Sequence, residues 1–160
     1  MKAVKIILMM ILTMNTNSFS QEKLPFNDLS RQESYVIETK GTETPFTGKY
    51  TNHTEKGTYV CKKCGSALYH SSFKFKSDCG WPSFDDEIKG AVSRFPDPDG
   101  SRTEIECTNC GAHLGHVFND GPPPTGLRYC LNSASMRFIP KKDLEKEGYG
   151  NYLKIFEGKK

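Results

Sequence analysis

The chain has 160 residues, of which 36% are hydrophobic and 26% are charged, and its formal net charge at pH 7 is +3. This length suits one modest globular domain and is too short for two comfortable ones. A charge so close to neutral excludes the electrostatic footprint of a nucleic-acid-binding protein.

Residues 1–20 have the composition of a secretory signal peptide. Lys2 and Lys5 precede the apolar run 6–14, and small polar residues follow it up to Ser20. Because the run is shorter than the ~20 residues that span a bilayer, we expect cleavage near Ser20 rather than an uncleaved membrane anchor. Removal of this segment, with its two lysines, would leave a net charge of about +1. The expected protein is exported, periplasmic or secreted, with no stable membrane anchor and no nucleic-acid partner.

The segment 21–140 predicts one domain that starts with a short helix. Ser30 and Glu33 match a capping box, and Gly41 marks the end of the helix. Further along, short runs rich in Tyr, Val, Phe and Thr alternate with turn residues, which is typical of a small antiparallel β fold. The predicted strands cover 48–52, 58–61, 91–95, 102–107, 127–132 and 135–139.

Two proline- and glycine-rich segments, "FPDPDG" (95–100) and "NDGPPPTG" (119–126), predict loops because proline cannot donate to a strand ladder. The segment 141–160 is a C-terminal extension with interleaved lysines and acids. It predicts a short helix ending at Gly148, and its mixed charges are typical of a solvated face.

Two Cys-x-x-Cys-Gly hooks, "CKKCG" and "CTNCG", predict a metal site. Two intervening residues let both sulfur atoms of a hook face one ion, and the glycine lets the chain turn back. Together the hooks supply a tetrahedral set of thiolates, for which zinc is the expected metal. The four predicted ligands are Cys61, Cys64, Cys107 and Cys110.

Two disulfides or a redox-active Cys-x-x-Cys are the alternatives for these thiols, since exported proteins often contain disulfides. A thioredoxin-like redox motif opens a helix beside a βαβ unit, and neither hook has that context. With a metal on the hooks, Cys79 and Cys130 are left for chemistry.

Cys130 lies in a predicted strand among polar neighbours. The period of two puts Arg128, Cys130 and Asn132 on one face. A guanidinium and an amide beside a thiol stabilise the thiolate, which is the nucleophilic form. The alternative is a buried cysteine that packs as a small hydrophobic residue.

The loop "SDCGWPSF" contains a second thiol and the only tryptophan. Cys79 has the setting of a loop thiol that closes a redox disulfide with another thiol. Trp81 is a candidate contact for an apolar part of a substrate, and ordinary core packing is its alternative.

The segment "AHLGHVFND" contributes His113 and His116, candidates for proton transfer near neutral pH. Residues three apart face opposite sides of a regular strand, so a joint role requires an irregularity at Gly115. Together with Asp120 they form an alternative second metal site, which lacks a clear further ligand.

The sequence resembles the methionine-R-sulfoxide reductase B family over about 30–140. The resemblance is carried by "GTETPFTG" (41–48), the two hooks, "CGWPSF" (79–84), "HLGHVF" (113–118) and "DGPPPTGLRYCLNSASMRF" (120–138), in the family's order. Two mild departures are Thr44 in place of a proline and Met136 in place of a leucine.

The resemblance implies a mainly β, barrel-like domain of two antiparallel sheets with one structural zinc ion. It implies that Cys130 attacks the sulfur of methionine-R-sulfoxide, mainly in proteins, and becomes a sulfenic acid as methionine leaves. Cys79 would then form a disulfide with Cys130, and a thioredoxin-type reductant would reopen it. The implied role is repair of oxidative damage.

The remaining roles also come from the resemblance. Trp81 would receive the methyl end of the substrate, and His113 and His116 would supply protons. Asp120, Arg128 and Asn132 would arrange water and charge around them. Because export removes the enzyme from cytosolic thioredoxin, we expect a periplasmic or membrane-relayed electron donor. The competing interpretations are a zinc-containing binding module without chemistry and an exported structural protein with three disulfides.

Overall fold

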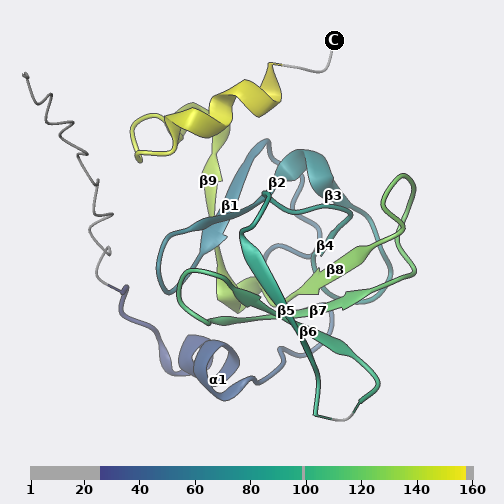
Figure 1. The fold of residues 1–160 in the computed structure, drawn as a ribbon. Helices are drawn as coiled ribbons and strands as arrows, with labels where there is room; N and C mark the ends of the chain where they lie inside the picture. Colours follow the sequence, from purple (N-terminus) through teal and green to yellow (C-terminus); the bar gives the residue numbers. More distant parts are fainter. Residues whose placement is uncertain (1–25, 99, 158–160) are drawn as a thin grey trace, which may run out of the picture.

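The computed structural model describes residues 26–98 and 100–157 (Figure 1). In chain order the elements are α1 (Arg31–Thr39), β1 (Gly57–Cys61), β2 (Ala67–His70), η1 (Ser71–Phe73), β3 (Lys74–Phe75), β4 (Ser83–Phe84), β5 (Val92–Pro96), β6 (Thr103–Cys107), β7 (His113–Phe118), β8 (Arg128–Leu131), η2 (Ser133–Ser135), β9 (Met136–Pro140), η3 (Lys141–Asp143) and η4 (Gly150–Phe156), where η marks a 3₁₀ helix. The predicted signal peptide lies outside the described residues. None of the helices in the described part is long and apolar enough to cross a membrane.

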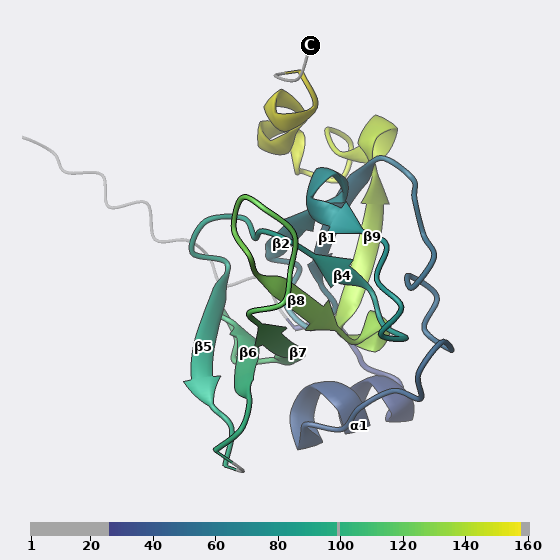
Figure 2. The same ribbon diagram turned by 90° about the vertical axis from the view of Figure 1, so that its right-hand side faces the viewer.

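The strands form two antiparallel sheets, as expected for the mainly β class. One sheet has the order β2-β1-β9, and the other has the order β3-β4-β8-β7-β6-β5. Both views place α1 at one end of the molecule and the C-terminal segment at the opposite end (Figures 1 and 2). The core contains the fully buried rings of Tyr59 and Tyr69 from the smaller sheet and of Phe84 and Tyr129 from the larger one. The apolar faces of both sheets are therefore buried in one shared core.

The predicted strands at 58–61, 91–95, 102–107, 127–132 and 135–139 are confirmed as β1, β5, β6, β8 and β9. The predicted strand at 48–52 is wrong. Its residues form turns, in which the amide of Thr51 donates to the carbonyl of Gly48 at 3.1 Å. Tyr50 is buried there because its amide donates to Ser133 Oγ and its hydroxyl accepts from the amide of Phe138. Contacts with distant segments, rather than a strand ladder, fix this β-prone stretch.

The predicted helix is confirmed as α1, with both halves of its capping box. The Glu33 amide donates to Ser30 Oγ at 3.3 Å, and the Ser30 amide donates to Glu33 Oε2 at 2.8 Å. Lys40 ends the helix in the left-handed conformation. Val36 and Ile37 form the buried face, which packs against β7 and η2.

The C-terminal extension differs from its prediction. In place of one helix ending at Gly148, it has η3, a series of turns and then η4. The lysines and glutamates in its described part are exposed, as predicted for a solvated face, whereas the apolar Leu144 is fully buried and packs with Val60 and Ile139. Tyr149, Tyr152, Leu153 and Phe156 join the same cluster. The extension therefore covers apolar side chains of β1 and β9.

Candidate active site and metal centre

The two cysteine hooks come together, as predicted. The sulfur atoms of Cys61, Cys64, Cys107 and Cys110 all lie within 4.8 Å of one another. Each hook is closed by the amide of the following glycine, which donates to the carbonyl of the first cysteine at 2.9 Å in one hook and 2.8 Å in the other. Both glycines have positive φ, 78° at Gly65 and 68° at Gly111, which favours glycine at this position.

The donor chemistry of this cluster fits a tetrahedral metal such as zinc. Three of the four cysteines are buried, and all six cysteines of the chain are free thiols in the structure. The structure therefore does not contain the disulfides considered as an alternative. Among the described residues, the cluster is also the only group of three or more His, Cys, Asp or Glu side chains arranged to hold a metal. The second metal site suggested for His113, His116 and Asp120 is therefore wrong.

The two remaining thiols face each other. Cys130 lies in β8, and Cys79 lies in the loop before β4, the strand that pairs with β8. Their sulfur atoms are 3.6 Å apart, and Cys79 Sγ is also 3.1 Å from Ser77 Oγ and 3.3 Å from Ser83 Oγ. A small rotation would bring the two sulfur atoms to bonding distance, so the pair has the placement that reversible disulfide formation needs.

The two thiols differ in acidity. Burial and the neighbouring Cys79 raise the pKa of the Cys130 thiol to about 12, although Arg128 opposes this shift. For Cys79, burial works against ionisation, but contacts with Ser77, Ser83, the Trp81 carbonyl and Cys130 lower its pKa to about 7. The expected stabilisation of a Cys130 thiolate by Arg128 is present, but burial and the neighbouring Cys79 outweigh it, so Cys79 ionises more readily than Cys130 in the resting pair.

Trp81 lines a pocket rather than the core. The pocket holds about 100 Å³ and is lined by Thr42, Trp81, Arg102, Gly115, His116, Phe118, Cys130, Leu131 and Asn132. The indole N–H donates to the carbonyl oxygen of Glu43 at 3.1 Å, which fixes the ring at the pocket wall. An indole, a phenyl ring and a thiol therefore face the same small space.

The two histidines meet because β7 is irregular. The register between β6 and β7 shifts at Ile105 and Glu106, and Gly115 has a φ of 152°. The imidazole rings of His113 and His116 lie 5.7 Å apart as a result. The irregularity that a joint role requires is therefore present at the predicted glycine.

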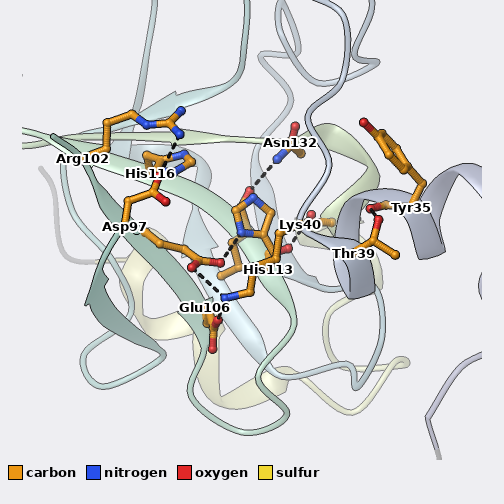
Figure 3. Close-up of polar contacts among 12 residues, drawn as sticks. Tyr35, Thr39, Lys40, Asp97, Arg102, Glu106, His113, His116 and Asn132 are labelled. Atoms are coloured by element: carbon orange, nitrogen blue, oxygen red, sulfur yellow. Dashed lines mark hydrogen bonds and ion pairs between the residues drawn. The ribbon is translucent and has the colours of Figure 1, made fainter. Parts of the chain in front are cut away.

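Each imidazole has its own carboxylate (Figure 3). His113 Nδ1 is 2.6 Å from Glu104 Oε1, and His116 Nε2 is 2.9 Å from Asp97 Oδ2. Glu104 also accepts from Lys40 Nζ at 2.8 Å. Burial lowers the pKa of His113, against the opposing effect of Glu104, and thereby favours the neutral ring. His116 lines the pocket, whereas His113 is almost fully buried behind it.

The remaining predicted residues lie around this centre. Arg128 donates to both carboxylate oxygens of Asp120 at 2.8 Å, and its guanidinium carbon lies 4.5 Å from the centre of the Phe118 ring. Asn132 donates to the Leu114 carbonyl and accepts from the Glu43 amide. Its amide group therefore holds backbone segments together, and no stabilising contact with Cys130 is seen.

This geometry can be compared with known proteins. The SelR domain model matches residues 29–140. The chain is 53% identical over 115 residues to the peptide methionine sulfoxide reductase MsrB of Agrobacterium fabrum, covering 70% of this chain and 85% of that protein. It is 49% identical over 137 residues to MsrB of Staphylococcus saprophyticus, covering 82% of this chain and 95% of that protein. The chain belongs to the MsrB (SelR) family.

Two further matches are weaker, one because it covers only about half of the related protein and the other because its sequence and fold are less similar. The mitochondrial methionine-R-sulfoxide reductase B3 of Mus musculus is 47% identical over 135 residues, which is 82% of this chain and 53% of that protein. A crystal structure of the Mis18 "Yippee-like" domain covers 53% of this chain with 18% identity and a TM-score of 0.40, too low to inform the site. Membership of the MsrB family agrees with the resemblance seen in the five motifs.

Sequence reasoning missed the carboxylates that support this MsrB site. Glu43 is buried, and its side chain accepts from the amides of Ser133 and Ala134, directly after the strand that holds Cys130. Glu104 and Asp97 contact the histidines. In the sequence all three look like ordinary charged residues of turns and strand faces. For Glu43 alone a signal existed, since it lies inside the quoted motif "GTETPFTG".

Proposed function

We propose that this chain reduces methionine-R-sulfoxide in oxidised proteins to methionine and thereby repairs oxidative damage. The observation that carries the proposal is the 3.6 Å approach of Cys79 and Cys130 beside a Trp81-lined pocket, in a member of the MsrB family. A binding module without chemistry would not need two thiols in bonding reach of each other next to a pocket.

The first step forms a sulfenic acid on Cys130. The Cys130 thiolate attacks the sulfoxide sulfur, the oxygen is transferred to the cysteine with uptake of one proton, and the thioether of methionine leaves. The nearby Arg128 guanidinium favours the negative charge on Cys130 in this step.

The second step recycles the enzyme. The Cys79 thiol attacks the Cys130 sulfenic acid, which gives a disulfide and releases water. A thioredoxin-type dithiol then reduces this disulfide and is itself oxidised. If the segment 1–20 directs export, the donor is a periplasmic or membrane-relayed thiol protein. Only the amino-acid sequence of residues 1–20 supports export and this choice of electron donor.

The pocket suggests how the substrate lies. Trp81 and Phe118 offer an apolar wall to the methyl end of the side chain, and His116 is placed to supply a proton to the departing oxygen. His113, behind it, supports the position of His116. Asp120 holds Arg128, and Asn132 holds the backbone on both sides of the site. With these roles, the Cys130 sulfur attacks a sulfoxide whose methyl group lies beside the Trp81 indole.

We assign zinc to the four-cysteine cluster as a structural ion. Cys61, Cys64, Cys107 and Cys110 would hold it, and four thiolates leave no open position for substrate. The ion would supply folding free energy rather than chemistry.

The test uses the metal-containing protein and a peptide with methionine-R-sulfoxide, and measures methionine formed with a small dithiol reductant. The wild type should turn over the R epimer and leave the S epimer unreacted, because each epimer has its own enzyme class. Cys130→Ser should abolish methionine formation. Activity that survives this substitution would remove Cys130 from the nucleophilic role.

Cys79→Ser separates attack from recycling. The variant should form about one methionine per protein molecule in a single turnover, because attack needs one thiol. Turnover driven by thioredoxin should stall, because recycling needs two thiols. Mass spectrometry should then find oxidised Cys130 without an internal disulfide, and unchanged thioredoxin-driven turnover would refute the role of Cys79.

A further inference from the structure

The loop between β5 and β6 contains a charged pair, Asp97 and Arg102, that the proposed reaction does not yet use. Asp97 follows β5 directly, and its Oδ2 lies 2.8 Å from an Arg102 nitrogen and 2.9 Å from His116 Nε2. Figure 3 shows Arg102 and His116 converging on this one carboxylate. The side chains of Asp97 and His116 are only 15% and 14% exposed, so solvent screens their interaction weakly.

The backbone holds Asp97 in place. Its amide donates to the Arg102 carbonyl at 3.0 Å, and its carbonyl accepts from the Gly100 amide at 2.8 Å. The carboxylate therefore belongs to a closed turn at the end of a paired hairpin, rather than to a free loop. Arg102 and His116 both line the pocket, whereas Asp97 is not among the lining residues.

Such a carboxylate fixes the tautomer of a histidine. When Nε2–H donates to Asp97, the neutral ring has its lone pair on Nδ1, and a second proton can be held only at Nδ1. The other charged or titratable groups near the ring are His113, at 5.7 Å between ring centres, and Glu104 and Cys130, which are opposite His116 in the adjacent strands. Glu104 already accepts from His113, so Asp97 is the carboxylate bound to His116.

We infer that Asp97, anchored by Arg102, is a positioning residue that orients His116 and fixes Nδ1 as the nitrogen that handles the proton in the pocket. This inference rests on the proposed reduction of methionine sulfoxide and adds to it the device that sets the proton donor. Asp97 acts through His116 and does not touch the substrate.

The experiment compares wild type, Asp97→Asn and Asp97→Ala in a Cys79→Ser background, where one methionine forms per molecule. Asp97→Asn keeps the shape and removes the charge. Glu147→Gln is the matched control, because Glu147 also pairs with an arginine at 2.8 Å but lies on the C-terminal extension. Circular dichroism and metal content establish that each variant is folded.

Two readouts are taken from the same samples. Nitrogen-15 NMR of labelled histidine should show His116 as the Nε2–H tautomer in the wild type and as a mixture in Asp97→Ala. In Asp97→Ala the single-turnover rate of methionine formation should fall about tenfold to a hundredfold, the range found when the carboxylate partner of a metal-ligating histidine is removed. The substrate concentration for half-maximal rate should stay nearly constant, and Glu147→Gln should match the parent.

A tautomer that is unchanged in Asp97→Ala would overturn the inference, even if the rate falls. An unchanged rate with an altered tautomer would overturn it equally, since the orientation would then not matter to the reaction. A wild type that forms no methionine would refute the proposed function, whereas the NMR comparison would still decide whether Asp97 orients His116.

Discussion

At the scale of single residues, the two thiols of the site have different surroundings. Cys79 is surrounded by Ser77, Ser83 and a backbone carbonyl, whereas Cys130 is buried in a strand. The two serines favour the Cys79 thiolate, and burial disfavours a Cys130 thiolate. Ionisation at rest is therefore favoured on Cys79, the thiol that the proposed cycle uses second.

Ser83→Ala should raise the pH at which Cys79 becomes reactive. In the wild type the pKa of Cys79 is lowered to about 7, so its thiolate is present above that pH and is lost below it. Removing one stabilising hydroxyl moves the midpoint upwards, by about one pH unit for a loss of ~1.4 kcal/mol. Iodoacetamide labelling of the metal-containing protein against pH, followed by mass spectrometry of the Cys79 peptide, measures the midpoint. Ser93→Ala, which contacts Thr108 instead, is the control, and an equal midpoint in both variants would contradict the charge assignment.

At the scale of elements, β7 brings the parts of the site together. Its irregular register turns both histidines to one region, and Gly115 lies against the carbonyl of Cys130 in β8. A Cβ at Gly115 would overlap that carbonyl oxygen. The glycine therefore sets the distance between the histidine strand and the cysteine strand.

Gly115→Ala should push β8 away and damage both stability and chemistry. We expect a loss of roughly 1–3 kcal/mol in the free energy of unfolding, as for other overpacked sites. The single-turnover rate should fall as well, because Cys130 is displaced. Gly90→Ala is the matched control, since Gly90 also has positive φ but its Cβ would meet open space. Urea unfolding and methionine formation measure the two effects, and equal losses in both variants would contradict the role given to close approach.

The elements also show what sequence can predict. Local signals were reliable where one short segment decides the outcome, as for the Ser30–Glu33 capping box and for the glycine that closes each hook. Four strands were missed: β2 has only four residues, β3 and β4 have two each, and β7 contains a glycine and two histidines. The approach of Cys79 to Cys130 and the carboxylates behind the histidines depend on pairing between distant strands. No spacing in the sequence encodes these contacts. Assigning the other four cysteines to a metal left Cys79 and Cys130 for chemistry, and the family resemblance implied that these two form a disulfide with each other.

At the scale of the whole molecule, the four-cysteine cluster joins the two sheets. Cys61 ends β1 of the three-stranded sheet, and Cys107 ends β6 of the six-stranded sheet. The C-terminal extension reaches the same place, where the hydroxyl of Tyr149 donates to the carbonyl of Gly65 at 2.6 Å. The extension lies beyond the matched SelR domain and yet supports one of its hooks.

Tyr149→Phe should therefore release the metal faster. Loss of one hydrogen bond costs about 0.5–1.5 kcal/mol. If this cost falls only on the metal-bound protein and not on the transition state for metal release, release should be roughly twofold to tenfold faster. Release into a chromogenic chelator measures the rate. Tyr35→Phe, which removes the hydroxyl of an exposed tyrosine on α1, should release metal at the wild-type rate. Complete removal of the metal should also unfold the protein, seen as loss of the circular dichroism signal.

The position of the four-cysteine cluster at the junction of the two sheets has a consequence for how the protein withstands repeated turnover. In the proposed cycle the sulfur atoms that are oxidised and reduced belong to Cys79 and Cys130, whereas Cys61 and Cys107 lie where the two sheets meet. Repeated turnover would thus make and break only one sulfur–sulfur bond and leave the junction between the sheets intact.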